Sequence, residues 1–155
     1  SVAQHSLAVL ALRREAEPTG LTARAELREL LHDADEGLLG FDPLSVLKPF
    51  LGDGFHALAG RLQDAVFQRY GLTYWTADEK IEHKKADRIA AASEAVHVAG
   101  WTRDEVKHVL KIPFKPLERD PLMATYGGTP WEPWAPTVAA ERFLKELKRI
   151  QKKLA

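Results

Sequence analysis

Two histidines and two aspartates in this chain have side chains that could bind one metal ion together. His5 lies in Ser-Val-Ala-Gln-His-Ser, His32 and Asp33 lie in Leu-Leu-His-Asp-Ala-Asp-Glu, and Asp87 lies in Lys-Lys-Ala-Asp-Arg-Ile. This mixed set of nitrogen and oxygen ligands suits a divalent transition metal (Mn, Co, Zn, Fe or Ni) better than Ca²⁺. Such an ion can activate a water molecule and orient a phosphate group. The four residues are therefore the first candidates for a catalytic metal centre.

These four residues fall in segments with helical periodicity, which decides whether their side chains can meet. His5 belongs to an apolar stripe with steps of three and four residues, which predicts a helix that turns this ring toward the core. A second predicted helix ends at His32 and Asp33, where a turn lets adjacent side chains converge. Asp87 lies among small apolar residues of a longer predicted helix, and a carboxylate buried there needs a positive partner. A shared metal ion would be that partner.

The same four residues have less specific interpretations. A histidine on an apolar helix face is often a core residue whose ring is hydrogen-bonded, and His5 fits that description. Asp87 also has Lys84 and Arg88 close by in the sequence, and either could pair with its carboxylate. Additional histidines, His83 and His56, would be needed for a second metal ion, but their flanking residues resemble no two-metal motif.

Capping and apolar patterns in the middle of the chain predict more helices. Thr76 and Thr102 each begin a capping-box pattern, with a glutamate three residues later, and predict one helix to about residue 98 and one short helix. An apolar pattern over residues 55–70 predicts another helix, closed by Gly71. Strand signals, such as alternating apolar residues and hairpin turns, do not recur. The fold class that follows is all-α.

The C-terminal part of the chain differs in composition. Residues 112–136 are rich in proline, glycine and tryptophan and predict a long loop. Thr137 is expected to cap a last helix over residues 137–154. No repeat or second domain boundary is visible, so we expect residues 1–155 to form a single domain with about five core helices and a C-terminal helix.

Length, charge and composition exclude several classes of protein. The 155 residues suffice for one domain with a sizeable core, and the 22 basic and 22 acidic side chains cancel. Balanced charge argues against a nucleic-acid polymer or an anionic membrane as partner. The chain has no cysteine, no visible signal peptide, and no apolar run near the length of about 20 residues that spans a bilayer. We expect a cytoplasmic protein that does not bind a membrane.

Four segments resemble the successive motifs of the HD-domain superfamily of metal-dependent phosphohydrolases. The resemblance is closest to its small bacterial nucleotidase branch, which includes 5′-deoxynucleotidases and deoxynucleoside triphosphate hydrolases. The matching segments lie within residues 1–100 and are Ser1–Ser6, Leu30–Glu36, Asp42–Lys48 and Lys84–Glu94. Two departures stand out: Gln4 replaces the usual glutamate, and Phe41 separates Asp42 from the preceding glycine.

The resemblance implies an HD-type helical domain that binds one divalent metal ion through His5, His32, Asp33 and Asp87. It also implies hydrolysis of a phosphate ester or anhydride of small (deoxy)nucleotides by a metal-activated water molecule. The substrate would be a small nucleotide, and a homo-oligomer is left open. The base, the sugar and the number of phosphates remain undetermined.

The resemblance further implies roles for two acids and two lysines. Glu36 would orient or deprotonate the attacking water or protonate the leaving oxygen, and Asp42 would support the leaving group or the sugar. Lys48 and Lys84 would contact phosphate, because phosphoryl transfer places negative charge on the phosphate oxygens. The alternative for each lysine is a solvated surface side chain.

Two other functions compete with this one. A noncatalytic HD-like domain would bind a nucleotide or a partner, and it gains weight if Glu36 points away from the metal ligands. A purely structural helical bundle would leave the grouped histidines and aspartates unexplained. The four tryptophans could stack on a nucleobase, although large aromatic side chains more often anchor a core or a loop.

Overall fold

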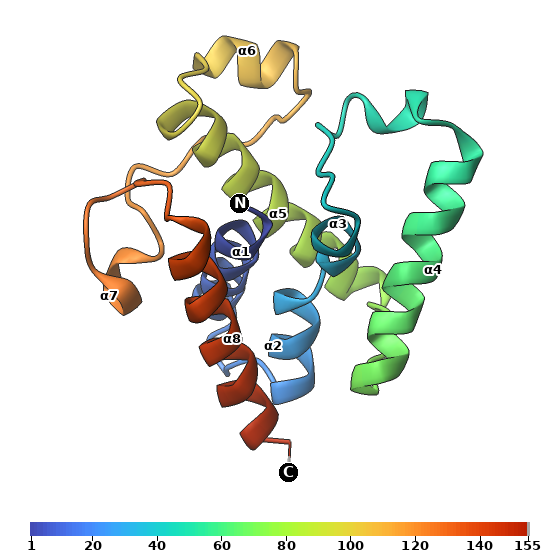
Figure 1. Cartoon of the computed structure of the whole chain (residues 1–155). Helices are drawn as coiled ribbons and strands as arrows, with labels where there is room; N and C mark the ends of the chain where they lie inside the picture. Colours follow the sequence, from blue (N-terminus) through green and yellow to red (C-terminus); the bar gives the residue numbers. More distant parts are fainter. Residues whose placement is uncertain (155) are drawn as a thin grey trace.

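Helix α1 (Val2–Ala16) is at the centre of the structure, a computed structural model that describes residues 1–154 (Figure 1). It packs against α2 (Ala23–Leu30), α5 (Ala77–His97) and α8 (Pro136–Lys152). The described residues contain helices and loops and no β-strand, so the predicted all-α class is confirmed. The four helices share one core, whose largest buried members include Leu7, Val9, Leu10, Leu27, Leu30, Leu147 and Ile150.

Threonine caps fix where three helices begin, as the sequence predicts. The hydroxyl of Thr22 accepts a hydrogen bond from the backbone N–H of Ala25 at the start of α2. Thr76 opens α5 and Thr102 opens α6 (Arg103–His108), and both arms of the capping box are present at each. Each cap satisfies backbone donors that the first turn of a helix leaves free.

The helical conformation is interrupted after α2, and this interruption places the His-Asp pair in a turn. Helix α2 ends at Leu30, and helix α3 (Ala34–Leu39) begins immediately after Asp33, which is its N-terminal cap residue. Helix α3 ends at Gly40, whose φ of 63° is the left-handed conformation that glycine adopts easily. The turn leaves both side chains of the pair free to point toward α1 and α5.

Two predictions for the C-terminal region are wrong in detail. The segment 112–136 is not entirely loop, because it contains the one-turn helix α7 (Met123–Tyr126). The last helix begins at Pro136 with Ala135 at its N-cap, so Thr137 does not cap it. Proline is favoured at the first helical position, since its missing N–H is not needed there.

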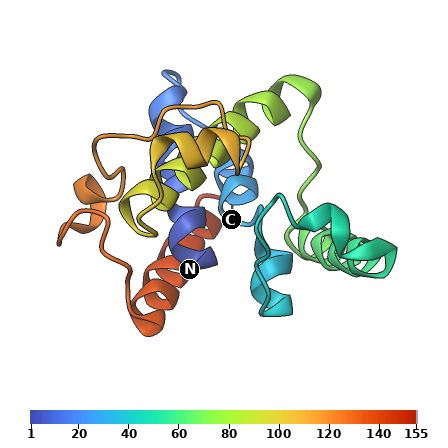
Figure 2. The same cartoon turned by 90° about the horizontal axis from the view of Figure 1, so that it is seen from above.

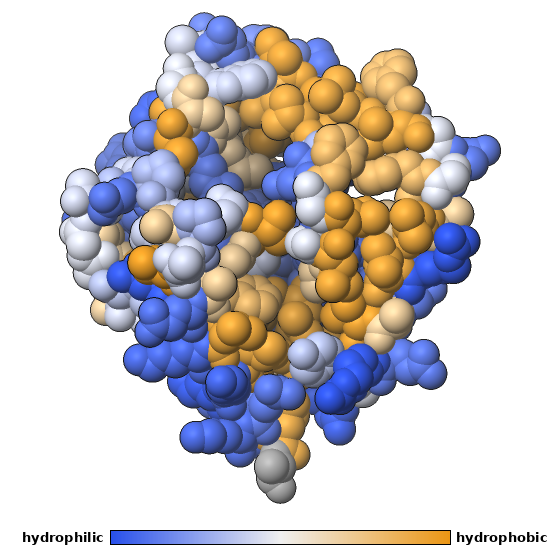
Figure 3. Space-filling model, viewed as in Figure 1, coloured by the Kyte–Doolittle hydropathy of each residue, from blue (hydrophilic) through white to orange (hydrophobic). Residues whose placement is uncertain are grey.

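Helix α4 (Gly52–Tyr70) lies to one side of the other helices in both ribbon views (Figures 1 and 2). It packs mainly on α3, follows the short 3-10 turn Lys48–Phe50, and has a single buried residue, Phe67. Apolar surface covers this side of the molecule in Figure 3, and its exposed side chains include Leu38, Phe41, Leu44, Leu47, Phe50 and Leu58. No described helix is long and apolar enough to cross a lipid bilayer.

Ion pairs tie α8 to α1 and α2 beside the core. Glu146 accepts hydrogen bonds from Arg14 at 2.5 Å and from Arg149 at 2.7 Å, and Glu26 accepts from Arg14 and Lys153, each at 2.7 Å. Burial raises the pKa of Glu146, but the hydrogen bonds from Arg149 and Arg14 outweigh it and hold the pKa at about 2. The ionised form of Glu146 is therefore the one that stabilises the fold.

Replacing this acid should change how stability depends on pH. The pKa of a glutamate in an unfolded chain is about 4.3, so the contribution of Glu146 is complete above about pH 5 and is lost as the pH falls toward 2. We expect the free energy of unfolding of Glu146→Gln to lie below that of the parent at neutral pH and to approach it in acid. Denaturant titrations of both proteins across this range measure the difference.

Glu141→Gln is the matched control, because Glu141 is exposed on the same helix and forms no ion pair with any residue in 1–154. Its difference from the parent should stay constant across the same pH range. A constant difference for Glu146→Gln as well would contradict the prediction.

Candidate metal centre

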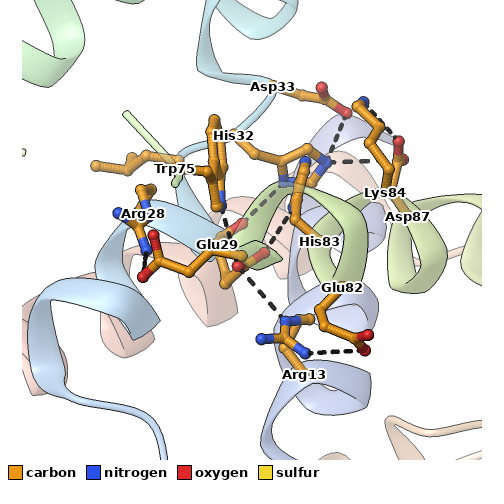
Figure 4. Close-up of polar contacts among 12 residues, drawn as sticks. Arg13, Arg28, Glu29, His32, Asp33, Trp75, Glu82, His83, Lys84 and Asp87 are labelled. Atoms are coloured by element: carbon orange, nitrogen blue, oxygen red, sulfur yellow. Dashed lines mark hydrogen bonds and ion pairs between the residues drawn. The ribbon is translucent and has the colours of Figure 1, made fainter. Parts of the chain in front are cut away.

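The four predicted metal ligands converge from three parts of the chain. One ligand atom each of His5, His32, Asp33 and Asp87 lies within 4.8 Å of the other three. The Nε2 atom of His5 is 3.2 Å from Asp87 Oδ1 and 3.7 Å from Asp33 Oδ2. The Nε2 atom of His32 is 3.0 Å from Asp33 Oδ2 (Figure 4). The structure thus brings together all four residues that sequence reasoning selected.

Hydrogen bonds to the other ring nitrogen orient both imidazoles. The Nδ1 atom of His5 lies 2.9 Å from Glu94 Oε2, and the Nδ1 atom of His32 lies 2.8 Å from the backbone oxygen of Glu29. In each case Nδ1–H donates to an oxygen and leaves Nε2 facing the cluster. Metal-binding histidines usually have such a partner, which fixes the tautomer and the orientation of the ring.

One buried atom tests whether these residues fit a metal ion. The Nε2 atom of His32 is buried and has no hydrogen-bond partner among the described residues, although Asp33 is close. Buried polar atoms are rarely left without a partner. A divalent ion held by the four residues would bind this lone pair and balance the charge of the two carboxylates. The donor set therefore fits a divalent transition metal.

The protonation of the cluster shows how strongly its charges interact. Burial raises the pKa of Asp33, but the neighbouring His32 and His5 lower it to about 2. Burial also raises the pKa of Asp87, and the hydrogen bond from His5 contributes to holding it well below its usual range. Burial lowers the pKa of His5, yet Glu94 and Asp87 raise it above its ordinary value. Both aspartates are therefore ionised at neutral pH and attract a cation.

Below the cluster, a buried polar network supports the backbone that carries His32 (Figure 4). Glu29 accepts hydrogen bonds from His83 Nδ1 at 2.6 Å and from Trp75 Nε1 at 3.2 Å, and Arg13 Nε is 3.6 Å away. His83 is thus paired with an acid and is not grouped with the four ligands. Sequence reasoning missed this network, although Glu29 precedes His32 by only three residues.

Every predicted site residue except His32 lines one cavity of about 710 Å³. His32 is buried beneath the cavity wall. The cavity contains both predicted lysines, but both already have acidic partners: Lys84 Nζ is 2.8 Å from Asp87 Oδ2, and Lys48 Nζ is 2.5 Å from Glu36 Oε1. Lys84 is nevertheless solvent-exposed and Lys48 is partly exposed, so a contact of either lysine with phosphate stays a prediction.

Glu36 is a buried carboxylate beside the ligand Asp33. It lies in the first turn of α3 and is 6% exposed. Burial raises its pKa, the charge of Asp33 and the nearby Asp42 raise it further, and Lys48 opposes them, so that the pKa is about 7. A group with a pKa near neutrality can both accept and donate a proton.

Gln4, which replaces the glutamate expected from the resemblance, pins a distant loop to α1. Its Nε2 donates to the backbone oxygen of Glu132 at 2.9 Å, and its Oε1 accepts from the backbone N–H of Trp134 at 3.0 Å. Gln4 lines the same cavity and directly precedes His5. A carboxylate has no hydrogen to donate to the Glu132 oxygen, so the amide is required for this pair of bonds.

An uncharacterized protein from Rhodobacter capsulatus is similar to this chain. The two are 39% identical over 120 residues, which make up 77% of this chain and 60% of that protein. The chain therefore spans less than two thirds of the length of that relative. No protein-family model matches the chain. The name of the relative gives no activity.

Removing a ligand should remove the metal ion. We expect His32→Ala and Asp87→Ala to lose divalent metal, because each variant deletes a donor from a set of four. His56→Ala, which changes an exposed histidine on α4, should retain the metal content of the parent. Elemental analysis of the purified, metal-loaded proteins measures this. Full metal occupancy in both ligand variants would refute the assigned site.

A chelator gives an independent readout of the same site. Binding to the native state alone stabilises it by about 2.7 kcal/mol at a metal concentration 100 times Kd. This corresponds to a fall in Tm of roughly 5–10 °C when a chelator removes the ion from a domain of this size. The chelator should scarcely move the Tm of Asp33→Ala. An equal shift in both proteins would count against metal binding here.

Gln4→Glu should loosen the loop that Gln4 holds. The variant loses the donor to the Glu132 oxygen and leaves two acceptors facing each other. Loss of one such bond costs about 1–2 kcal/mol, or a fall in Tm of roughly 2–8 °C. Thermal unfolding measures the shift. Gln4→Ala, which also removes the acceptor of the Trp134 N–H, should in addition accelerate hydrogen exchange of that amide. An unchanged exchange rate in Gln4→Ala would show that Gln4 does not hold the loop.

Proposed function

We propose that this chain is a metal-dependent phosphohydrolase of the HD-domain type that acts on small nucleotides. The grouping of His5, His32, Asp33 and Asp87, three of which line one cavity, carries this proposal. The resemblance of four motifs, in their usual order, supports it. The cysteine-free sequence suits a reducing compartment, and we place the protein in the cytoplasm as part of the same proposal.

The residues around the cluster can bind and orient a phosphate group. A divalent ion, when bound, would supply Lewis acidity and lower the pKa of a water molecule. Lys48 and Lys84 line the cavity close to the ligands and would compensate charge on phosphate oxygens. Lys48 pairs with Glu36, and Lys84 pairs with Asp87. An anionic substrate would draw the lysines away from these acids, and a bound cation would neutralise the charge of Asp87.

Glu36 is placed to move the proton in hydrolysis. The four ligands satisfy a mononuclear site without it, so its carboxylate is free to accept a proton from water or to return one to the leaving oxygen. Asp42 lines the same cavity and would hold the leaving group or the sugar. Because Glu36 lines the cavity and its carboxylate is close enough to Asp33 for the charge of Asp33 to raise its pKa, the catalytic proposal is favoured over a noncatalytic HD-like binding domain.

Hydrolysis can be tested directly with a substrate screen. The protein, loaded in turn with Mn²⁺, Co²⁺ or Zn²⁺, is incubated with nucleoside mono-, di- and triphosphates. Separate measurement of phosphate, pyrophosphate and tripolyphosphate identifies the bond that is cleaved. We expect release from at least one class, and Asp87→Ala should abolish it. No release from any nucleotide with any of the metals would refute the proposed function.

Glu36→Gln should separate catalysis from metal binding. Glutamine keeps the size of the side chain but cannot accept a proton at neutral pH. We expect a loss of about 10²–10⁴ in kcat, the usual contribution of a positioned general acid–base, with metal content unchanged. The matched control is Asp35→Asn, one residue earlier in α3, because Asp35 does not line the cavity. Near-parent rates in Glu36→Gln would refute the assigned role.

A further inference from the structure

The cavity lined by three of the candidate metal ligands extends along α5, and the residues that α5 contributes to its lining change from charged to apolar along the helix. At one end α5 contributes Lys84, Asp87 and Arg88 to the lining. At the other end the lining includes Ala95 and Val98, the residue that caps the C-terminus of α5. With a rise of 1.5 Å per residue, Asp87 and Val98 are about 16 Å apart along the helix. A ligand that fills the cavity would therefore have an anionic group at one end and an apolar group at the other.

The apolar end of the cavity has a well-packed wall. Leu110 and Ile112 line it and belong to a second hydrophobic cluster with Ala92 and Val106, the buried residue of α6. Trp101 also lines the cavity and packs against this cluster. Figure 3 shows a hollow in this face of the molecule, bordered by apolar surface. Side chains held by a packed cluster form a surface that exists before a ligand binds.

Two residues with unusual backbone conformations line the same end. Lys111 and Trp131, with φ values of 57° and 62°, are the non-glycine residues with positive φ in the described chain, and both line the cavity. Trp131 is held by a 2.7 Å hydrogen bond from its N–H to Asp120 and by stacking on His97, with ring centroids 4.4 Å apart. Such conformations are costly and are concentrated at ligand sites.

The four tryptophans divide into two pairs with different surroundings. Trp101 and Trp131 line the cavity, whereas Trp75 stacks on His83 in the buried network. Trp134 packs on Tyr126 and lies under the guanidinium of Arg142, 4.1 Å from the ring centroid. Only the first pair is available to a ligand in the cavity.

We propose that the end of the cavity lined by Trp101, Trp131, Leu110 and Ile112 binds the nucleobase of the substrate. This inference rests on the proposed function and adds to it the orientation of the nucleotide along α5. A nucleobase is planar, has apolar faces that stack on aromatic rings, and has polar edges that Lys111 can reach as a donor. A ligand with an alkyl chain in place of the base would not use the two indoles in this way.

Trp131→Gly is the variant that tests the subsite. Glycine removes the indole and adopts a positive φ without strain, so the backbone of the loop is not penalised. The four 2′-deoxynucleoside 5′-monophosphates are titrated calorimetrically into Glu36→Gln and into Glu36→Gln/Trp131→Gly, both loaded with Mn²⁺. We expect the tightest-binding nucleotide to lose about 5- to 100-fold in affinity, as for loss of one base–aromatic contact. The affinity for inorganic phosphate, measured by competition, should not change.

Two further variants separate contact with the base from order in the loop. Trp131→Phe keeps an aromatic face and should restore most of the nucleotide affinity. Trp134→Ala, a tryptophan of the same loop that does not line the cavity, should lower the Tm but leave nucleotide affinity unchanged. Equal affinity in parent and Trp131→Gly, or equal losses in Trp131→Gly and Trp134→Ala, would overturn the subsite.

The outcomes also separate this inference from the proposed function. If no nucleotide is hydrolysed but deoxynucleosides still bind in a Trp131-dependent way, the proposed function fails and the subsite stands. If nucleotides are hydrolysed but their affinity does not depend on Trp131, the function stands and the subsite fails. If neither nucleotides nor deoxynucleosides bind to the Glu36→Gln protein, the subsite is overturned.

Discussion

Two partly buried carboxylates held close to each other require positive charge, and much of the structure follows from this requirement. Asp33 and Asp87 come from different elements and meet at two imidazoles whose Nε2 atoms face them. In a weakly polar interior, like charges at this separation repel strongly unless a cation lies between them. Protons on the histidines can supply that charge, and a divalent ion would supply it while also using the lone pair of His32. Helices α1, α2 and α5 must pack as they do for these atoms to meet.

The groups that orient the ligands connect the cluster to the rest of the molecule. Glu94 fixes the ring of His5 from α5, and the backbone of Glu29 fixes the ring of His32 from α2. Gln4 then links the same end of α1 to the loop that carries Trp131. A change in how α1 sits would therefore move a ligand and the wall of the cavity together. The two hydrogen bonds of Gln4 therefore order the loop that carries Trp131.

Local sequence patterns predicted the helices well and selected four residues that the structure groups together, because both inferences depend on short spacings. The threonine caps, the helical stripe of His5 and the adjacent His32–Asp33 pair are all visible within a few residues. The bond between Gln4 and Glu132 joins residues 128 positions apart, and no periodicity reveals it. The sequence pattern predicted Thr137 as the N-cap of the last helix. In the structure α8 begins at Pro136, because proline is favoured at the first helical position. Conformations such as the positive φ of Trp131 depend on long-range packing and were equally invisible.

The site is divided between two parts of the fold that differ in how firmly they are held. The metal ligands lie on or next to α1, α2 and α5, which share the main core. Glu36, Asp42 and Lys48 come from α3 and the segment that follows it, which pack on α4, a helix with a single buried residue. Segments with few buried apolar contacts open more readily than a core. The chain thus combines four candidate metal ligands on the main core with a more weakly anchored group of Glu36, Asp42 and Lys48. Under the proposed function, a substrate would displace Lys48 from Glu36 without moving the helices that carry the four ligands.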